Sequence, residues 1–432
     1  MADVTDVNTG NGRGNDSGNG NGNGNPHGNG NPHGHGHGHG NGNGRESAGA
    51  NLPTLRGHNA ALVLDLLRTA GEGGISRLEL AERTGLTPQA VSKITARLRT
   101  EGMAAEAGRR ASTGGKPRTV LRLVPSAAYA VGLHLDRDEL TAVLVDLAGT
   151  PVAVRRVPFD LGAGAERVIE AAAVQVNAVR AEAGRAGAER VGAEQVEAER
   201  VGAERVGAEL RAGELLGVGV AMPGPLDHAT GVPRRVTGFP QWDGFPLRDA
   251  LAARLQLPVV LDKDTNAAAL GLALRGPGDS FVYLHLGTGL GAGLVLGGTL
   301  HRGARTGAGE FGHQVIQLDG PLCECGSRGC IEALCLAAVA RGDLAEAARV
   351  LGAGAANLVG LLDIDRVLLG GRTIAAHEER FVRGVAAAVA ERARGAGIVV
   401  AAAQGGAHPV AEGAAQLVLA PVFKHRRSAE LG

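Results

Sequence analysis

The chain has 432 residues, 70 of them Gly, and its 44 Lys and Arg balance 44 Asp and Glu, so the formal charge is zero. This length has room for two or three domains, 2% aromatic residues imply aliphatic cores, and only four Cys exclude a disulfide scaffold. The sequence starts without a charged-then-apolar leader, so we expect a cytoplasmic protein without a membrane segment.

Residues 1–50 consist mostly of Gly, Asn, Asp, Ser and His and show no hydrophobic period. Such a segment cannot bury enough apolar surface to offset the entropy of ordering it, so we expect a disordered tail. Alternating His and Gly between His33 and His39 could chelate a transition metal, although a solvated tail is the simpler interpretation.

Residues 51–125 have the pattern of a winged helix-turn-helix domain. Apolar residues recur at helical spacing in Ala61–Arg68 and in Arg77–Thr84, and Thr87-Pro88 suits the start of a third helix, with Thr as the N-cap. Two strand-like stretches within Ala104–Leu123 follow. This order predicts three helices and a β-ribbon, the outline of a DNA-binding module.

This segment is basic although the whole chain is neutral. Residues 52–123 carry twelve Lys or Arg against six Asp or Glu, a local charge of +6, and phosphate neutralisation supplies most non-specific DNA affinity. Gln and Lys on the third helix can reach base edges, while Ser and Arg suit phosphate. A small helical cap with a solvated face is the alternative. The residues expected to contact DNA are Thr87, Gln89, Ser92, Lys93, Arg97, Lys116 and Arg118.

Beyond residue 125 short apolar strands alternate with helices. The predicted strands are Ala130–Leu135, Leu140–Asp146, Val152–Pro158, Leu216–Ala221, Val259–Leu261, Phe281–Leu286 and Leu294–Leu296. Helices are predicted from about Ala165 and near Asn266–Leu274 and Leu344–Leu362. This alternation predicts an α/β domain of two lobes over residues 126–432.

One segment of this domain is a short repeat. Ala188–Val206 repeats a five-residue unit, AERVG, with small changes. A period of five matches neither a helix nor a strand, because it spreads the valines around the element. We therefore expect a low-complexity insertion at about residues 186–211, in a surface loop or at a helix end.

Three of the four Cys lie within eight residues, at Cys323, Cys325 and Cys330. Glycines between them let the backbone turn the three sulfurs toward one centre, and thiolates at this density suit tetrahedral Zn²⁺. His313, ten residues upstream, would supply a fourth ligand. Three unliganded buried thiols are the alternative. Cys335 lies outside the cluster and is expected in the core.

The stretch GEFGH at Gly309–His313, followed by the Cys cluster and Glu332, resembles the signature of the ROK family of repressors and sugar kinases. The N-terminal module is similar to that of the family's regulators. Further similar segments are Gly217–Asp227, Trp242–Leu247, Asp264–Ala269 and Leu286–Gly293. Together these segments extend the resemblance over roughly residues 55–425.

The resemblance implies an actin-like, ribonuclease-H-like domain of two lobes, with a sugar in the cleft and, in the kinases, a nucleotide beside it. By motif, Glu310, His313 and Glu332 would contact sugar hydroxyls, and His313 would also hold the zinc ion. Asp264 matches the general base of the kinases. From the sequence alone, Asp264 could equally be the N-cap of the helix that follows it.

The chain departs from the kinases at the first phosphate turn. The kinases open the domain with a strand followed by Asp, two Gly and Thr, whereas this chain has His134 in place of the Asp, and Asp136 and Arg137 in place of the glycines. These side chains, with Asp138 and Glu139 after them, would repel a triphosphate and block its approach to the backbone. A second phosphate loop at Gly287-Thr288-Gly289 survives.

These features predict a transcription regulator of carbohydrate metabolism, a repressor that binds double-stranded operator DNA and a sugar or sugar phosphate, contains zinc, and forms a homodimer or homotetramer. We do not expect an enzyme. One alternative is a sugar kinase with an appended DNA-binding module, which Asp264 and Gly287–Gly293 favour. Another is a constitutive DNA-binding protein whose second domain only dimerises. Lys263 fits that alternative, because the family usually has a sugar-binding Asn there.

Overall fold

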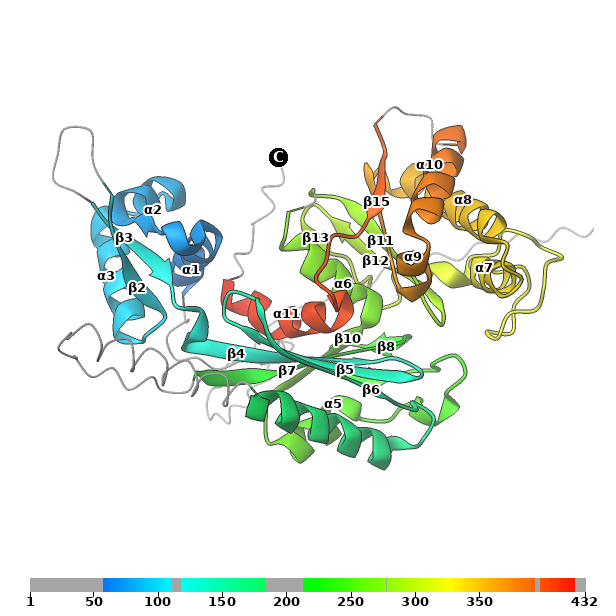
Figure 1. Cartoon of the computed structure of the whole chain (residues 1–432), viewed down its shortest axis with the longest axis horizontal. Coiled ribbons are helices and arrows are strands. Elements are labelled where there is room, and N and C mark those ends of the chain that lie inside the picture. The colour runs from blue at the N-terminus through cyan, green and yellow to red at the C-terminus, as the bar shows by residue number, and fades with distance from the viewer. Residues whose placement is uncertain (1–56, 111–117, 183–212, 277, 393–396, 424–432) are drawn as a thin grey trace, which may run out of the picture. The chain divides into compact units, whose positions relative to one another are not determined.

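A computed structural model of the chain describes residues 57–110, 118–182, 213–276, 278–392 and 397–423 (Figure 1). The predicted tail, the pentapeptide insertion and most of the wing, Lys116 included, lie outside these residues. The proposed boundary of the tail near residue 50 therefore stays a prediction.

The first described elements form a small helical module with a three-stranded sheet. They are α1 (His58–Ala70), η2 (Gly71–Gly73), β1 (Ile75–Ser76), α2 (Arg77–Thr84), α3 (Pro88–Thr100), β2 (Ala104–Arg110) and β3 (Arg118–Leu123). The strands are antiparallel in the order β1-β3-β2. All three predicted helices and the ribbon are confirmed.

Local capping explains where the helices of this module begin. The Thr87 hydroxyl accepts a hydrogen bond from the backbone N–H of Ala90, as the sequence predicted for an N-cap. Ser76 and Glu79 form a capping box at the start of α2, in which each side chain accepts from the other residue's backbone N–H. Gly85 ends α2 with a φ of 69°, which permits the tight turn before α3.

The next part of the chain builds a five-stranded sheet in the order β10-β7-β4-β5-β6. Its elements are η3 (Pro125–Ala127), β4 (Ala128–Leu135), β5 (Glu139–Asp146), β6 (Pro151–Pro158), β7 (Glu214–Met222), β8 (Leu226–Asp227), β9 (Val232–Pro233), η4 (Pro240–Trp242), α5 (Leu247–Leu255) and β10 (Val259–Lys263). Residues 165–182 are helical. The meander β4–β6 is antiparallel, and β7 and β10 run parallel to β4.

A second five-stranded sheet follows, in the order β13-β12-β11-β14-β15. The elements of this last part of the chain are α6 (Asp264–Ala273), β11 (Phe281–Leu286), β12 (Leu290–Leu296), β13 (Thr299–Leu300), η5 (Phe311–His313), α7 (Ile331–Ala340), α8 (Leu344–Leu362), β14 (Arg366–Gly370), α9 (Arg372–Ala376), α10 (Glu378–Arg392), β15 (Val399–Ala402) and α11 (Pro409–Phe423). The sheet repeats the first pattern of three antiparallel strands extended by two parallel ones. The predicted two-lobed α/β domain is confirmed: the first lobe contains the first five-stranded sheet, and the second lobe contains the second one. The predicted helix near Asn266 begins two residues earlier than expected.

The last helix, α11, packs closely on the first sheet (red in Figure 1). Glycines in the strands make this approach possible. A Cβ at Gly132 of β4 would lie 1.8 Å from the carbonyl oxygen of Ala411, and one at Gly219 of β7 would lie 1.8 Å from that of Ala414. Only residues without a side chain fit beneath the helix at these two positions.

One helix in the described part of the chain, α8, is long and apolar enough to cross a membrane. In the folded chain 61% of its apolar window is buried. The core of the second lobe contains α8 together with α7, α10 and the faces of β11 and β14. Burial of this kind is typical of the core helix of a globular domain.

The strand directions place several loops at one location. Strands β4, β7 and β10 are parallel and end at Leu135, Met222 and Lys263, while β11 ends at Leu286. Ligands of open α/β sheets bind beyond such carboxyl ends. The residues that follow these strands are therefore the place to look for a site.

Candidate functional site

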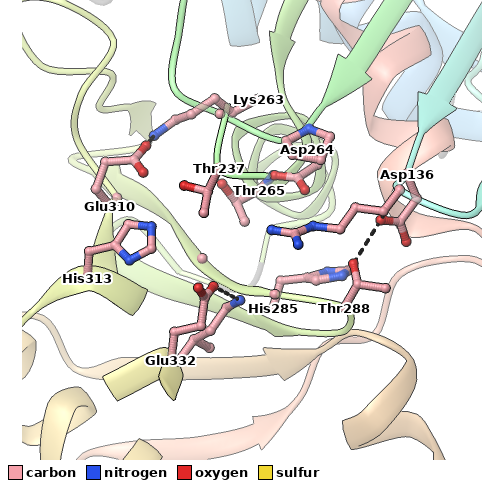
Figure 2. Close-up of a pocket in the computed structure, with 17 residues that line it drawn as sticks. Asp136, Thr237, Lys263, Asp264, Thr265, His285, Thr288, Glu310, His313 and Glu332 are labelled. Carbon is pink, nitrogen blue, oxygen red and sulfur yellow. Dashed lines mark hydrogen bonds and ion pairs between the residues drawn. The ribbon is translucent and has the colours of Figure 1, made fainter. Parts of the chain in front are cut away.

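A polar pocket lies beyond the carboxyl ends of these strands. Its lining includes Asp136 after β4, Gly224 after β7, Asp264 after β10 and Thr288 after β11. Figure 2 shows Glu310, His313 and Glu332 along one side of the pocket, facing Asp264 and Thr265 on the other. The four residues expected to bind a sugar thus come together in one pocket.

Asp264 is the first residue of α6, and Lys263 takes the N-cap position. The N-cap interpretation is therefore off by one residue, although the Asp264 carboxylate does accept a hydrogen bond from the backbone N–H of Thr265 at 2.6 Å. Burial raises the pKa of this carboxyl to about 7, and the negative charge of Asp136 adds to the rise. A carboxyl poised near neutral pH can accept or release the proton of a ligand hydroxyl.

Glu310 is paired with the residue that departs from the family pattern. The Lys263 ammonium lies 2.9 Å from a Glu310 oxygen and also donates to the backbone carbonyl of Ala308. The Lys263 side chain is only 3% exposed. Gly224 leaves room for it, because a Cβ there would lie 2.6 Å from Lys263 Cδ. The Lys263 ammonium therefore balances the negative charge of the Glu310 carboxylate in the pocket.

Glu332 is held in position by the second lobe. It lies in the first turn of α7, is buried, and accepts a hydrogen bond from the backbone N–H of Leu290 at 2.8 Å. One carboxylate oxygen is thereby fixed at the start of β12. The other oxygen retains hydrogen-bonding capacity toward the pocket.

Two partly buried histidines, His134 and His285, lie near Asp136. Burial lowers the pKa of His285 to about 4, and its Nδ1 lies 2.9 Å from the Tyr283 hydroxyl. Burial also lowers the pKa of His134, whose Nε2 has no hydrogen-bond partner among the described residues.

The predicted metal ligands also meet. The ligand atoms of His313, Cys323, Cys325 and Cys330 all lie within 4.8 Å of one another. The sulfurs of Cys325 and Cys330 are 3.7 Å apart, and His313 Nδ1 is 3.7 Å from Cys323 Sγ. Tetrahedral zinc with Zn–S bonds of about 2.3 Å requires sulfurs about 3.8 Å apart. The donor set therefore fits a four-ligand zinc site, and the chain holds a His/Cys₃ cluster that could bind a metal.

The backbone of the cluster depends on glycine. Gly329 has a φ of 66°, and a Cβ there would lie 1.5 Å from the carbonyl oxygen of Gln317. Cys330 follows it and is the N-cap residue of α7. Because Cys330 precedes Glu332 by two residues and His313 lines the pocket, the cluster and the pocket share two short segments. Cys335 lies apart in the core, as expected, and donates to the carbonyl oxygen of Ala347.

The expected DNA-contacting residues that the structure describes are all exposed on the N-terminal module. Helix α3 buries Val91, Thr95 and Leu98. The exposed residues are Thr87, Gln89, Ser92, Lys93 and Arg97. Arg118, the first residue of β3, is exposed as well, and Arg97 Nε lies 4.0 Å from a Glu101 oxygen.

The sequence did not single out several residues of the pocket. Thr237, Thr265 and His285 line it. So do Thr288, noted only as part of the second phosphate loop, and Arg137, which was interpreted only as a block to phosphate. Four of these five residues lie in or shortly after a predicted strand. The rule that ligands bind beyond strand ends could have found them, but Thr237 lies in an irregular loop and gives no such signal.

Comparison with known proteins agrees with this geometry. A sequence model described as "ROK family" matches residues 203–339, and one described as "Winged helix-turn-helix DNA-binding" matches residues 63–103. The chain carries a ROK domain behind a winged helix-turn-helix domain. The resemblance stated from the motifs is therefore confirmed.

Named relatives include both regulators and kinases. The xylose repressor of Bacillus subtilis (strain 168) is 27% identical over 261 residues, which are 60% of this chain and 61% of that protein. The glucokinase of Thermotoga maritima is 44% identical over 133 residues, 30% of this chain and 42% of that enzyme. The chain thus spans about three fifths of the length of the xylose repressors it matches.

A solved structure supports the fold. A ROK family transcriptional regulator, described as a homologue of the E. coli MLC protein, has a TM-score of 0.63 and 19% identity, and the match covers 85% of this chain and 98% of that one. At this identity the likeness concerns the fold alone. The predicted class, an actin-like α/β domain preceded by a winged helix-turn-helix, is confirmed.

Proposed function

We propose that the protein is a DNA-binding transcription regulator, a repressor, whose ROK domain binds a sugar or sugar derivative. The observation that carries this proposal is that one chain combines a basic winged helix-turn-helix with a polar pocket that gathers Asp264, Glu310, His313 and Glu332. A sugar presents many hydroxyls and needs such an array of fixed acceptors and donors. The xylose repressors among its relatives make D-xylose the first ligand to test.

On the DNA side, α3 would lie in the major groove of a duplex operator. Gln89 and Lys93 have the donors and acceptors to contact base edges, and Ser92 and Arg97 would contact phosphates. Arg118 and the wing beside it, with Lys116, would add phosphate contacts. A homodimer or homotetramer would present two such modules to the two half-sites of an operator.

The pocket supports ligand binding better than phosphoryl transfer. His134 supplies no carboxylate at the position of the kinases' Asp, and Arg137 lines the pocket where the kinases have glycine. The favourable features for a kinase are Asp264, with its raised pKa, and the glycine turn Gly287–Gly289. We therefore infer that the sugar binds as an effector and is not phosphorylated, with the sugar kinase as the second candidate.

We propose that zinc at His313, Cys323, Cys325 and Cys330 is structural. Four protein ligands leave no open position for an activated water, so the ion would hold the loop and not carry out chemistry. When bound, zinc would fix the His313 ring, and His313 would present its other edge to the pocket. A regulator of this kind acts where the DNA is, in the cytoplasm.

A ligand scan tests the proposal and separates its alternatives. Thermal unfolding is followed with D-xylose, D-glucose, N-acetylglucosamine and their 6-phosphates, each with and without Mg²⁺-ATP. A shift with sugar alone, together with release of the DNA fragment upstream of the gene, supports the regulator. A shift in unfolding temperature that requires both sugar and ATP supports the kinase. DNA binding that no sugar changes supports the constitutive DNA-binding protein.

The role of α3 has its own test. The double variant Lys93→Ala/Arg97→Ala should bind the same DNA fragment about tenfold more weakly. It should also lower the magnitude of the slope of log K against log salt concentration by about one, because the lost phosphate contact of Arg97 removes about 0.9 from that slope. Arg383→Ala, an exposed Arg on α10, is the matched control. An unchanged slope in the double variant would place α3 away from the DNA.

A further inference from the structure

The turn between β4 and β5 touches the second lobe with three consecutive residues. A carboxylate oxygen of Asp136 accepts a hydrogen bond from the Thr288 hydroxyl at 3.1 Å (Figure 2). The Asp138 carboxylate receives both terminal nitrogens of Arg372 at 3.0 to 3.1 Å. Thr288 lies in the β11–β12 turn and Arg372 begins α9, so two separate elements of the second lobe are reached.

Arg137, between these two acids, reaches a third element. Its guanidinium lies 3.6 Å from the Glu324 carboxylate, in the loop of the Cys cluster, and 5.7 Å from the centre of the Phe239 ring. We call Asp136, Arg137 and Asp138 with their partners Thr288, Glu324 and Arg372 the clasp. Each contact joins an element of the first lobe to an element of the second.

The clasp stands at the rim of the pocket. Asp136, Arg137 and Thr288 line it together with Asp264 and Glu310. The acidic turn was expected to act by repelling phosphate, yet Asp136 and Asp138 are both bonded across the cleft, so their main structural effect is attraction between the lobes. Glu139 is likewise paired, with Arg156 of β6, and does not compete for Arg372.

We propose that the clasp holds the two lobes closed over the pocket without any nucleotide, so that a pocket ligand enters and leaves only when these three contacts open. This goes beyond the function proposed above, because it requires neither DNA nor a particular sugar. In the kinases that the chain resembles, this turn must leave space for nucleotide phosphates. Here the chain's own side chains fill that space and connect the lobes.

The contacts have the strength expected of a reversible gate. The Asp138–Arg372 pair is bidentate but its side chains are 58% and 44% exposed, so water screens it. Exposed pairs of this kind shift an equilibrium by about two- to fivefold. The clasp therefore biases the cleft toward closure without locking it.

Hydrogen–deuterium exchange on the full-length, ligand-free protein tests this proposal. The reporters are the backbone amides of Gly287 and Leu290 in the β11–β12 turn, which are both hydrogen-bonded. In Asp138→Asn and in Arg372→Gln these amides should exchange about two- to fivefold faster, because the turn loses its restraint when the lobes separate. Arg383→Gln, which removes an exposed Arg–Glu pair with Glu379 on α10, away from the cleft contacts, should leave them unchanged.

The double variant separates a clasp from independent surface effects. Asp138→Asn/Arg372→Gln should exchange no faster than either single variant, since both remove the same contact. The charge swap Asp138→Arg/Arg372→Asp should slow exchange back toward the wild-type rate. Equal exchange in Arg372→Gln and Arg383→Gln, or fully additive single effects, would overturn the proposal. Because both positions are exposed, we expect the substitutions to leave the fold intact, and far-UV circular dichroism of each variant checks this.

Discussion

The two ends of the pocket differ in how closely their residues follow the motifs that the sequence resembles. At the sugar end, Glu310, His313 and Glu332 keep the family motif and face Asp264 across the pocket. At the phosphate end, the glycine turn Gly287–Gly289 remains, but the opposite turn carries acidic and basic side chains that bond to the second lobe.

Under the proposed function, this difference would separate ligand binding from phosphoryl transfer within one fold. In the function proposed here, sugar recognition would depend on side chains positioned by the His/Cys₃ loop, which could bind a metal, and by the hydrogen bond from the Leu290 N–H to the buried Glu332 carboxylate. Phosphate recognition depends on backbone N–H groups that only glycine leaves accessible. We therefore propose that side chains in place of two glycines weaken phosphate binding and leave sugar binding in place.

The largest expected effect is that removing the metal disorders the sugar end of the pocket and leaves the rest of the fold in place. In a chain lacking residues 1–50, whose histidines could retain stray metal, Cys323→Ser should lower zinc from about one ion per chain to near zero. Protease cleavage of the Cys loop and of Glu310–His313 should accelerate together, since they share the metal. Metal analysis by mass spectrometry and limited proteolysis measure both.

Cys335→Ser is the matched control for this experiment. Its thiol is buried like that of Cys323, but it lies outside the cluster and contacts Ala347. It should retain zinc and protection of the loop. Wild-type protein without stoichiometric zinc would remove the metal proposal and its contribution to the sugar end.

The next effect concerns Asp264, which lies between the two ends. Its pKa rises on folding from its usual acidic range to about 7, so the folded state binds the proton more tightly than the unfolded state. The free energy of unfolding therefore falls as pH rises from about 4 to about 7, by up to about 4 kcal/mol from this group, and then levels off.

Asp264→Asn keeps the hydrogen bond to the Thr265 N–H but does not titrate. Relative to wild type it should gain free energy of unfolding across this pH range, as measured by urea denaturation at pH 5, 6, 7 and 8. Thr265→Ser, which keeps that N–H, should follow the wild-type pH dependence. Parallel curves for Asp264→Asn and wild type would show that the carboxyl has an ordinary pKa.

The smallest expected effect is at the phosphate end, where we expect no turnover. Purified protein with D-glucose or D-xylose and Mg²⁺-ATP should release no more ADP than Asp264→Asn does under the same conditions. Coupled detection of ADP measures this. Sugar-dependent release of ADP that disappears in Asp264→Asn would show that the protein is a kinase and that both ends of the pocket take part in its reaction.

The sequence by itself determined whatever depends on neighbours along the chain. Hydrophobic periods predicted the strands of the first sheet, β11 and part of β12 in the second sheet, and the three helices of the DNA-binding module, but they missed β13, β14 and β15. The Thr87 cap was confirmed. The Cys cluster was evident because its thiols lie within a few residues and glycines fold them together. Such features follow from local propensity and spacing, which a single sequence records.

Only the tertiary structure decided which charges meet. Asp138 and Arg372 are 234 residues apart, and Lys263 and Glu310 are 47 apart, so no local pattern links either pair. Asp138 follows β4, Lys263 ends β10 and Arg372 follows β14, so these contacts depend on how the two sheets pack against each other. Packing of this kind depends on the whole core. It places the acidic turn at Asp136–Asp138, which the sequence suggested would only repel phosphate, in contact with the second lobe.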